Sequence, residues 1–317
     1  MPSSKDLYRI LCDSEPSIPL FSQYWWLDTV CGANRWDVFH WMDKGCMRAT
    51  FPVYVPASGI ASMPPFTQAM GPWFATEAAD TKYATALGRR QAICADFILK
   101  LRPYTVFMQN FHHSFVDWLP FYWEGFRQTT RYTYILGDIS DAGKLWAAMS
   151  ANIRRNINRA RCRNKISVRR GLSAEDLSRM AAMTFGRQNL KLKHAHLLEA
   201  LVAASRQRGR GDIWGGYDDE GRLHAAAFVV WHGDTAYYIA GGSDPALRES
   251  GAHSLTLWEA IRAVAAHSRS FDFEGSMLPG VERVFREFGA VQTPYFCISK
   301  GKPSVWDRIR IRLNRHG

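Results

Sequence analysis

Hydrophobic runs and turn residues in the first half of the chain predict helices and strands in mixed order. Residues 36–41 and 47–55 are rich in β-forming residues and flank Asp43-Lys44-Gly45, a turn sequence, so a hairpin is expected. The segment 60–73 holds three prolines and is expected to form an ordered loop over the sheet. Helices are expected within 1–20 and at 21–30 (with Ser22 as N-cap), 81–101 and 119–126, and strands at 105–110 and 131–136.

The second half continues this alternation. In the helix expected at 251–267, Leu255, Trp258 and Ile261 share an apolar face, while Glu259 and Arg262 lie on a polar one, which is typical of a helix packed on a sheet. The other helices are expected at 142–163, 174–186, 193–208 and 284–289, and the strands at 166–169, 212–217, 224–231, 236–240, 271–274 and 295–299.

The two halves share one layout: a hairpin, a strand, a long helix, a strand, a short helix and a final strand. The clearest local similarity joins 121–136 to 283–299, since each holds an aromatic helix, a turn and a strand that begins with Tyr. A chain of 317 residues fits two domains of about 150 residues each. The sequence therefore predicts an α/β fold of mixed α+β type, with domains at 1–140 and 141–317, the second carrying a basic helix and an amphipathic C-terminal tail.

Composition narrows the class of protein. Hydrophobic residues make up 47% of the chain and charged residues 22%, which indicates a globular protein with a sizeable core. No apolar run reaches the roughly 18 residues that span a bilayer, and the N-terminus does not resemble a signal peptide. The six cysteines form no CxxC pair, so free thiols in a reducing cytoplasm are expected.

The net charge of +11 favours an anionic partner, such as nucleic acid, a phosphorylated cofactor or a membrane surface, although a generally basic protein is the alternative. Arg154, Arg155 and Arg159 belong to an arginine-rich run on a predicted helix that suits a phosphate backbone, and a solvated surface helix is the other interpretation. The tail at 305–316 could lie on the inner membrane face or dock on its own domain.

A glycine-rich turn between a strand and a helix forms a candidate anion site, because the first amides of a helix lack partners and its dipole is positive there. An ordinary strand-to-helix turn is the alternative. The candidate donor-binding residues are Gly241, Gly242, Ser243, Gly251, Ala252, His253, Ser254 and Leu255. The histidines lack a third ligand at metal spacing, so no metal is expected.

Asp272, Glu274 and Arg286 form the best polar constellation in the sequence. Two carboxylates two residues apart on a strand point to the same face, and burial would raise the pKa of one of them, as a general base requires. Alternatively, one carboxylate pairs with an arginine and holds the last helix to the sheet. The RxxGxG-like string 206–211 is expected to be a helix end and a turn, and 248–253 carries His253 where that pattern has Gly or Ala.

The segments FDFEGS (271–276) and VFREFG (284–289), the helix NIRRNINRAR and the string TFGRQ (184–188) resemble FemABX-like proteins of the GCN5-related N-acetyltransferase (GNAT) superfamily. The resemblance covers residues 140–300 best and implies tandem GNAT-like domains without a coiled-coil arm. It also implies substrate-binding roles for Gln188 and Phe285. Phe285, Phe288 and Gly289 match the family's FKxxFG pattern, whereas Arg286 replaces its Lys.

The resemblance implies an N-acyltransferase that moves an acyl group from acyl-CoA or aminoacyl-tRNA to an amine of a peptidoglycan, exopolysaccharide or other cell-envelope precursor. Asp272 or Glu274 would deprotonate the amine, Arg286 would meet anionic charge, and the arginines at 154, 155 and 159 would hold tRNA or a nucleotide-linked acceptor. The alternative is a non-catalytic GNAT-like scaffold that binds nucleic acid or a sugar-nucleotide, as the departures at His253 and Arg286 would allow.

Overall fold

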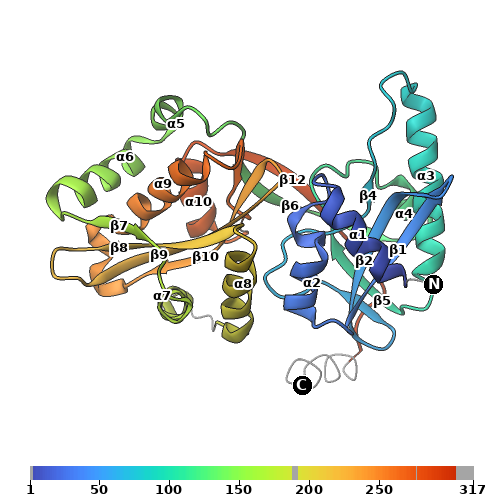
Figure 1. Cartoon of the computed structure of the whole chain (residues 1–317), viewed down its shortest axis with the longest axis horizontal. Helices are drawn as coiled ribbons and strands as arrows, with labels where there is room; N and C mark the ends of the chain where they lie inside the picture. Colours follow the sequence, from blue (N-terminus) through green and yellow to red (C-terminus); the bar gives the residue numbers. More distant parts are fainter. Residues whose placement is uncertain (1–2, 188–191, 276, 305–317) are drawn as a thin grey trace. The chain divides into compact units, whose positions relative to one another are not determined.

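The computed structural model describes residues 3–187, 192–275 and 277–304, and the chain divides into two compact units (Figure 1). Unit 1 comprises Met1–Arg131 and Pro294–Gly317, and unit 2 comprises Tyr132–Thr293. The division therefore falls nine residues before the end of the predicted first domain at residue 140, and the last part of the chain returns to unit 1. The predicted C-terminal tail lies outside the described residues.

Unit 1 is built around the predicted hairpin. Lys44 and Gly45 have φ angles of 49° and 80°, which is the left-handed backbone that a two-residue hairpin turn requires. The predicted N-cap Ser22 lies instead in a short 3₁₀ turn, η1 (Leu20–Ser22), and the next helix starts one residue after Gln23. The elements are α1 (Ser4–Ser14), α2 (Tyr24–Cys31), β1 (Trp36–Asp43), β2 (Cys46–Ala57), β3 (Ile60–Ser62), β4 (Trp73–Phe74), α3 (Tyr83–Lys100), β5 (Val106–Asn110) and α4 (Leu119–Trp123).

The strands of unit 1 run in the order β1-β2-β3-β5, and β12 (Val291–Lys300) pairs antiparallel with β5 through Cys297–Lys300. Aromatic rings fill the core between this sheet and α3. Phe51 is fully buried and its ring lies 5.6 Å from that of Phe97 and 5.7 Å from that of Phe111. This burial of apolar surface stabilises the unit.

Unit 2 starts within β6 (Arg127–Leu136) and holds the predicted helix 142–163 in three pieces. Ser150 interrupts it, because its hydroxyl accepts a hydrogen bond from the Ile153 N–H and caps a new helix. The elements that follow β6 are α5 (Ala142–Ala148), α6 (Ala151–Asn158), the π-helical turn η2 (Arg159–Arg163), β7 (Ser167–Arg170), α7 (Ala174–Arg187), α8 (Ala195–Gln207), β8 (Gly211–Tyr217), β9 (Leu223–His232), β10 (Thr235–Ser243), η3 (Pro245–Ser250), α9 (Ala252–Val264), β11 (Ser270–Asp272) and α10 (Pro279–Glu287).

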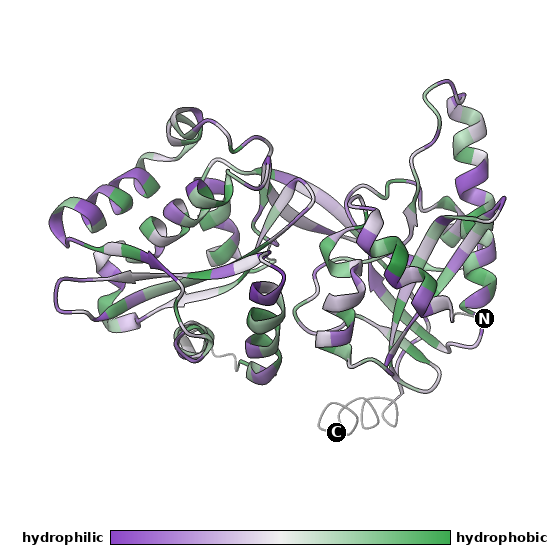
Figure 2. Cartoon of the chain, in the orientation of Figure 1, coloured by the Kyte–Doolittle hydropathy of each residue, from purple (hydrophilic) through white to green (hydrophobic). Residues whose placement is uncertain are grey.

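The sheet of unit 2 has the strand order β6-β11-β10-β9-β8-β7, with β10 and β11 parallel and the other neighbours antiparallel where their register is known. Helices α9 and α10 lie over one face and α7 and α8 over the other (Figure 1). Every residue of β9 is buried, as expected for a strand covered on both faces. Hydrophilic residues recur along α6 and into the turn before β7 (Figure 2).

The last strand of each half pairs within the other unit. Strand β6, which follows α4, pairs through Ile135 and Leu136 with β11 of unit 2, whereas β12, which follows α10, pairs with β5 of unit 1. The similarity between 121–136 and 283–299 thus corresponds to two equivalent helix-strand segments. The predicted fold class, with mixed and mostly antiparallel sheets flanked by helices, is confirmed.

Candidate active site

Strands β10 and β11 part after a short parallel ladder. Among the described residues, this ladder joins Thr235–Tyr237 to Ser270–Asp272. Strand β10 then continues to Ser243 alongside β9, with a register shift between Tyr238 and Ala240 that bends it. After Asp272 the backbone that follows β11 turns away from β10, because Glu274 and Gly275 both have left-handed conformations, with φ of 65° and 62°. Ligand sites in α/β proteins form where neighbouring strands diverge at their carboxyl ends.

Asp272 and Glu274 lie at this divergence. Asp272 is 2% exposed, and its Oδ1 accepts hydrogen bonds from the Thr133 hydroxyl and, at 2.8 Å, from the Glu274 N–H. Burial raises the pKa of Asp272 to about 6, against the opposing effect of these two hydrogen bonds. Burial and the neighbouring charge of Asp272 hold the pKa of Glu274 well above its usual range. Strand β11 ends at Asp272, so Glu274 is not part of it. The prediction that both carboxylates lie on one face of the strand is therefore wrong.

A left-handed backbone at glutamate is strained, because its Cβ crowds the following carbonyl. Such strain is concentrated at functional sites, where surrounding contacts enforce it. Here the hydrogen bond that the Glu274 N–H donates to Asp272 Oδ1 and the tight turn at Gly275 favour it. A Cβ on Gly275 would lie 2.1 Å from the Tyr132 carbonyl oxygen, so this turn sits directly against β6.

Two consecutive tyrosines, Tyr237 and Tyr238, lie at the end of the ladder between β10 and β11 and point to opposite faces of the sheet. Tyr237 pairs with Asp272 in register, and burial together with the charges of Asp272 and Glu274 raises its pKa. Tyr238 points to the opposite face, where its hydroxyl lies 3.3 Å from Nε2 of His253 and its ring lies 6.2 Å from that of Phe285. The sequence did not single out either tyrosine.

The predicted donor-binding glycines are in close contact with backbone and side chains. A Cβ on Gly241 would lie 2.2 Å from the Tyr238 hydroxyl, on Gly242 it would lie 2.1 Å from the Met180 carbonyl oxygen, and on Gly251 it would lie 2.3 Å from that of Asn156. Gly242 therefore lets α7 approach β10, and the Ser243 N–H donates to the Thr184 hydroxyl at 3.0 Å. Close packing therefore requires glycine at these three positions, and their role in donor binding stays a prediction.

The first turn of α9 holds the remaining predicted donor residues. Ala252, Ser254 and Leu255 are buried, and His253 is half-buried. Gly251 precedes them with a φ of 78°, which suits a residue without a side chain.

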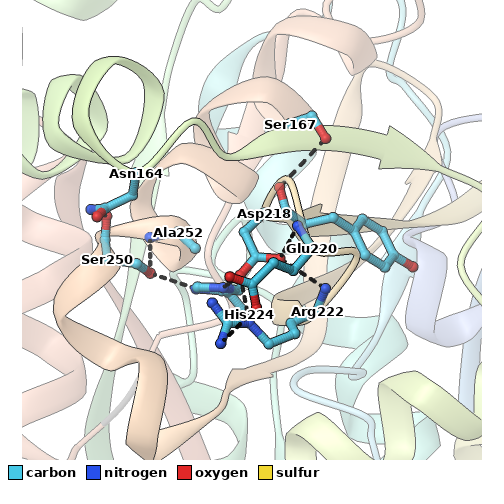
Figure 3. A network of polar contacts seen from close by, with 9 residues as sticks. Asn164, Ser167, Asp218, Glu220, Arg222, His224, Ser250 and Ala252 are labelled. Carbon is cyan, nitrogen blue, oxygen red and sulfur yellow. Dashed lines mark hydrogen bonds and ion pairs between the residues drawn. The ribbon is translucent and has the colours of Figure 1, made fainter.

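A network of side-chain hydrogen bonds holds the first turn of α9 in place (Figure 3). His224 Nε2 lies 3.0 Å from Asp218 Oδ2, and its Nδ1 lies 3.0 Å from the Ser250 hydroxyl, which accepts a hydrogen bond from the Ala252 N–H. The hydrogen bond with His224, followed by those from Arg222, holds the pKa of Asp218 well below its usual range. Asn164, after η2, donates to the Ser250 carbonyl at 3.0 Å. The helix start is thus tied to β9 and η2.

Helix α10 buries Phe285 and exposes Arg286, its two predicted site residues. Phe285 is 5% exposed and stacks on Phe273 with 4.9 Å between ring centroids, so it is a core residue. Arg286 is exposed, and its Nε lies 2.9 Å from Glu282 Oε1, which also accepts from the Tyr134 hydroxyl at 2.9 Å. The structure thus gives Arg286 an acidic neighbour on its own helix, whereas the alternative in the sequence was a pair with Asp272 or Glu274.

The predicted basic helix is α6. Arg155 and Arg159 are exposed and Arg154 is half-buried. Beyond it, a hollow of about 400 Å³ lies between η2, β7, β8 and α9, with Arg161, Arg170, Trp214 and Glu259 among its lining residues. Arg161 pairs with Glu259 at 2.6 Å, so part of this basic charge is compensated. Gln188 lies outside the described residues.

In the part of the chain that the structure describes, no helix is long and apolar enough to cross a membrane. Within the same residues, no group of three or more His, Cys, Asp or Glu side chains could hold a metal ion.

Residues 147–283 match the family model of the acetyltransferase (GNAT) domain. This part of the chain is similar to a GNAT acetyltransferase domain, as the sequence resemblance implied. It includes β10, β11, α9 and most of α10, and therefore both carboxylates and both tyrosines at the strand divergence. No curated protein matches the sequence.

Solved structures extend the similarity over the whole chain. The crystal structure of FemX covers 99% of this chain and 99% of its own, with a TM-score of 0.67 and 13% identity. L-PGS from Bacillus licheniformis covers 99% and 96% (TM-score 0.53, 12% identity), and a tandem GNAT protein from the clavulanic acid biosynthesis pathway covers 94% and 95% (TM-score 0.53, 11% identity). At these identities the similarity shows the fold, which has the tandem GNAT-like arrangement.

Proposed function

We propose that the protein transfers an acyl or aminoacyl group to an amine, and that Glu274 accepts the proton of that amine. The observation that carries this proposal is a carboxylate with a raised pKa and a strained backbone at the point where β10 and β11 part. A base whose pKa lies nearer to neutrality transfers protons most effectively near pH 7. The GNAT domain and the fold shared with FemX and L-PGS support an acyl or aminoacyl transferase in general.

In this reaction the amine nitrogen attacks the carbonyl carbon of the donor and its proton passes to Glu274. The bond from that carbon to the sulfur of a thioester, or to the oxygen of an ester, then breaks. Asp272 is too enclosed by Thr133 and the Glu274 N–H to meet the amine, so its role is to hold Glu274 and raise its pKa. Positioning of the two substrates supplies the rest of the rate enhancement.

The exposed arginines suit an anionic donor. Acyl-CoA or aminoacyl-tRNA would bind along β10 and the first turn of α9, and an aminoacyl-tRNA would also contact Arg154 and Arg155 on α6 and Arg159 at the start of η2. The tandem GNAT protein of similar fold is described with reference to AcCoA, which favours testing that donor first. The acceptor would be an amine of a cell-envelope or polysaccharide precursor.

The test pairs Glu274→Gln with Glu282→Gln, a carboxamide control on α10. Wild-type protein is assayed with acetyl-CoA and with aminoacyl-tRNA against a panel of amines. Glu274→Gln is expected to lower kcat by roughly 10²-fold or more while donor affinity is kept, and Glu282→Gln is expected to stay near wild type. Full turnover by Glu274→Gln would remove it as the base. Binding of RNA with no turnover of either donor would favour the non-catalytic scaffold, for which the exposed Arg155 and Arg159 are the supporting observation.

A further inference from the structure

The hollow between η2, β7, β8 and α9 lies away from the candidate active site. It has a volume of about 400 Å³ and sits at the end of the sheet of unit 2, where β7 is the last strand. The candidate active site lies where β10 and β11 part, and strand β9 separates β10 from β8 in the sheet. The proposed acyl transfer therefore gives this hollow no role.

The buried side chains that line the hollow are apolar. Ile166, Trp214 and Leu255 are at most 5% exposed and belong to the hydrophobic core of unit 2. Val168 on β7 adds a further aliphatic side chain to the lining. Small-molecule sites in proteins have volumes of about 300 to 1,000 Å³ and are mostly apolar, with a few polar groups that orient the ligand. The size and the buried lining therefore suit the hydrocarbon part of a small ligand.

The polar side chains that line the hollow are charged. Arg161 and Arg170 are 46% and 52% exposed, and Glu259 is 28% exposed. Arg161 Nη2 donates to Glu259 Oε1 at 2.6 Å, and Arg170 Nε donates to Asp212 Oδ2 at 2.7 Å. Each of these bonds uses one of the five N–H donors of a guanidinium, so both arginines keep donors for a further acceptor.

The two carboxylates that pair with these arginines are each shared with a second arginine. Glu259 also accepts from Arg262 Nη1 at 3.1 Å, and Asp212 also accepts from Arg206 Nη2 at 2.7 Å. Four positive and two negative charges thus surround the hollow, which leaves a net charge of +2. An excess of guanidinium groups attracts an anion, and the planar fork of each one matches a carboxylate or a phosphate.

We propose that this hollow is a second binding site, which takes an organic anion with an apolar body. Arg161 and Arg170 hold the carboxylate or phosphate group, and the hydrocarbon part lies against Trp214 and Leu255. The inference is independent of the proposed acyl transfer, because it uses none of the residues at the strand divergence. The alternative is a solvent-filled gap bordered by surface ion pairs, which would bind no ligand saturably.

The experiment titrates the full-length protein by isothermal titration calorimetry with three probes that share a phenyl body. These are 3-phenylpropionate, phenyl phosphate and the neutral 3-phenylpropanamide. Wild type is expected to bind an anionic probe saturably and at least about tenfold more tightly than the amide, since hydrogen bonds to charged groups are the stronger ones. The tighter of the two anions identifies the anionic group that the site prefers.

Arg161→Gln and Arg262→Gln form a matched pair, because each removes one arginine from Glu259 and only Arg161 lines the hollow. Arg161→Gln is expected to weaken the tighter anion by about tenfold, whereas Arg262→Gln should stay within about twofold of wild type. Glu259→Gln should tighten binding several-fold, because it removes a negative charge from the lining. Ala263→Trp should abolish binding by filling the hollow from the exposed side of α9.

Several outcomes would overturn the proposal. Wild type that binds neither anion saturably, or that binds the amide as tightly, contradicts an anion site. Equal losses in Arg161→Gln and Arg262→Gln would show that general positive charge attracts the probe without a built site. Glu259→Gln tests the same charges with the opposite sign, so an unfolded Arg161→Gln, detected by circular dichroism, still leaves a decision: unchanged or weaker binding by Glu259→Gln rejects the site.

Discussion

The Thr133 hydroxyl donates a short hydrogen bond to the carboxylate of Asp272 and so joins β6 to β11. These residues are 139 positions apart in the sequence, and both are buried. The hydrogen bond satisfies one oxygen of a carboxylate that would otherwise be costly to bury. The same oxygen accepts the Glu274 N–H, so the strand pairing and the candidate base share one anchor.

Replacing Asp272 with Asn should make stability less dependent on pH. The pKa of Asp272 is raised to about 6 in the folded protein, so the wild-type protein loses stability as pH rises from about 4 through 6. Asp272→Asn lacks this loss and keeps a hydrogen-bond acceptor for Thr133. Its free energy of unfolding, measured by urea titration, should exceed that of wild type by roughly 1 to 3 kcal/mol at pH 8 and match it near pH 4. An advantage that is independent of pH would contradict the raised pKa.

Replacing Gly242 with Ala should separate α7 from β10. The new Cβ would meet the Met180 carbonyl oxygen at 2.1 Å, and backbone cannot yield cheaply, so a loss of about 2 to 3 kcal/mol is expected. Gly88→Ala is the control, because nothing lies within 4 Å of its Cβ position in α3 and alanine favours a helix by up to about 1 kcal/mol. Thermal melts of the two variants should therefore shift in opposite directions.

Replacing Ser250 with Ala should loosen the first turn of α9. It removes the acceptor of the Ala252 N–H and the hydroxyl next to His224, and loss of a hydrogen bond of this kind costs roughly 0.5 to 1.5 kcal/mol. Ser167→Ala, which removes an exposed hydroxyl 3.4 Å from the Tyr217 carbonyl, should have little effect. Hydrogen exchange of the amides at 252–255 would locate the change. Equal protection in the two variants would show that Ser250 does not fix this turn.

Replacing Arg286 with Gln should test whether this exposed guanidinium meets the donor. Its ion pair with Glu282 is exposed, so the melting temperature should hardly change. The affinity for acetyl-CoA, measured by calorimetry, should fall several-fold, and less so in high salt. Arg283→Gln is the matched control, because Arg283 forms an equivalent pair with Glu287 on the same helix. Equal affinities in both variants would exclude a donor contact by Arg286.

Local patterns predicted most elements of the fold. The turn at Lys44-Gly45 and the amphipathic pattern of α9 depend on neighbours in sequence, and both were correct. The unit boundary was not predictable in this way. It depends on which strand β6 pairs with, and the register of Ile135 and Leu136 against β11 is a contact between distant residues.

The candidate site likewise combines features that the sequence predicted with features that depend on contacts between distant residues. Spacing in the sequence identified Asp272 and Glu274, but it assumed a regular strand and missed the left-handed backbone at Glu274. Tyr238 carries no motif, and its position follows from the end of the ladder with β11 and from the space above Gly241. Neither the end of the ladder nor this space can be derived from the sequence without knowing the partner strand of β10. His253 looked like a departure from a pattern until its contact with Tyr238 was known.

The exchange of last strands between the two halves has a consequence for synthesis. The first 131 residues are synthesised before β12, so one edge of β5 has no partner strand until residues 297–300 are made. An unpaired edge invites association with other chains. A fragment that stops before β12 should therefore aggregate rather than fold.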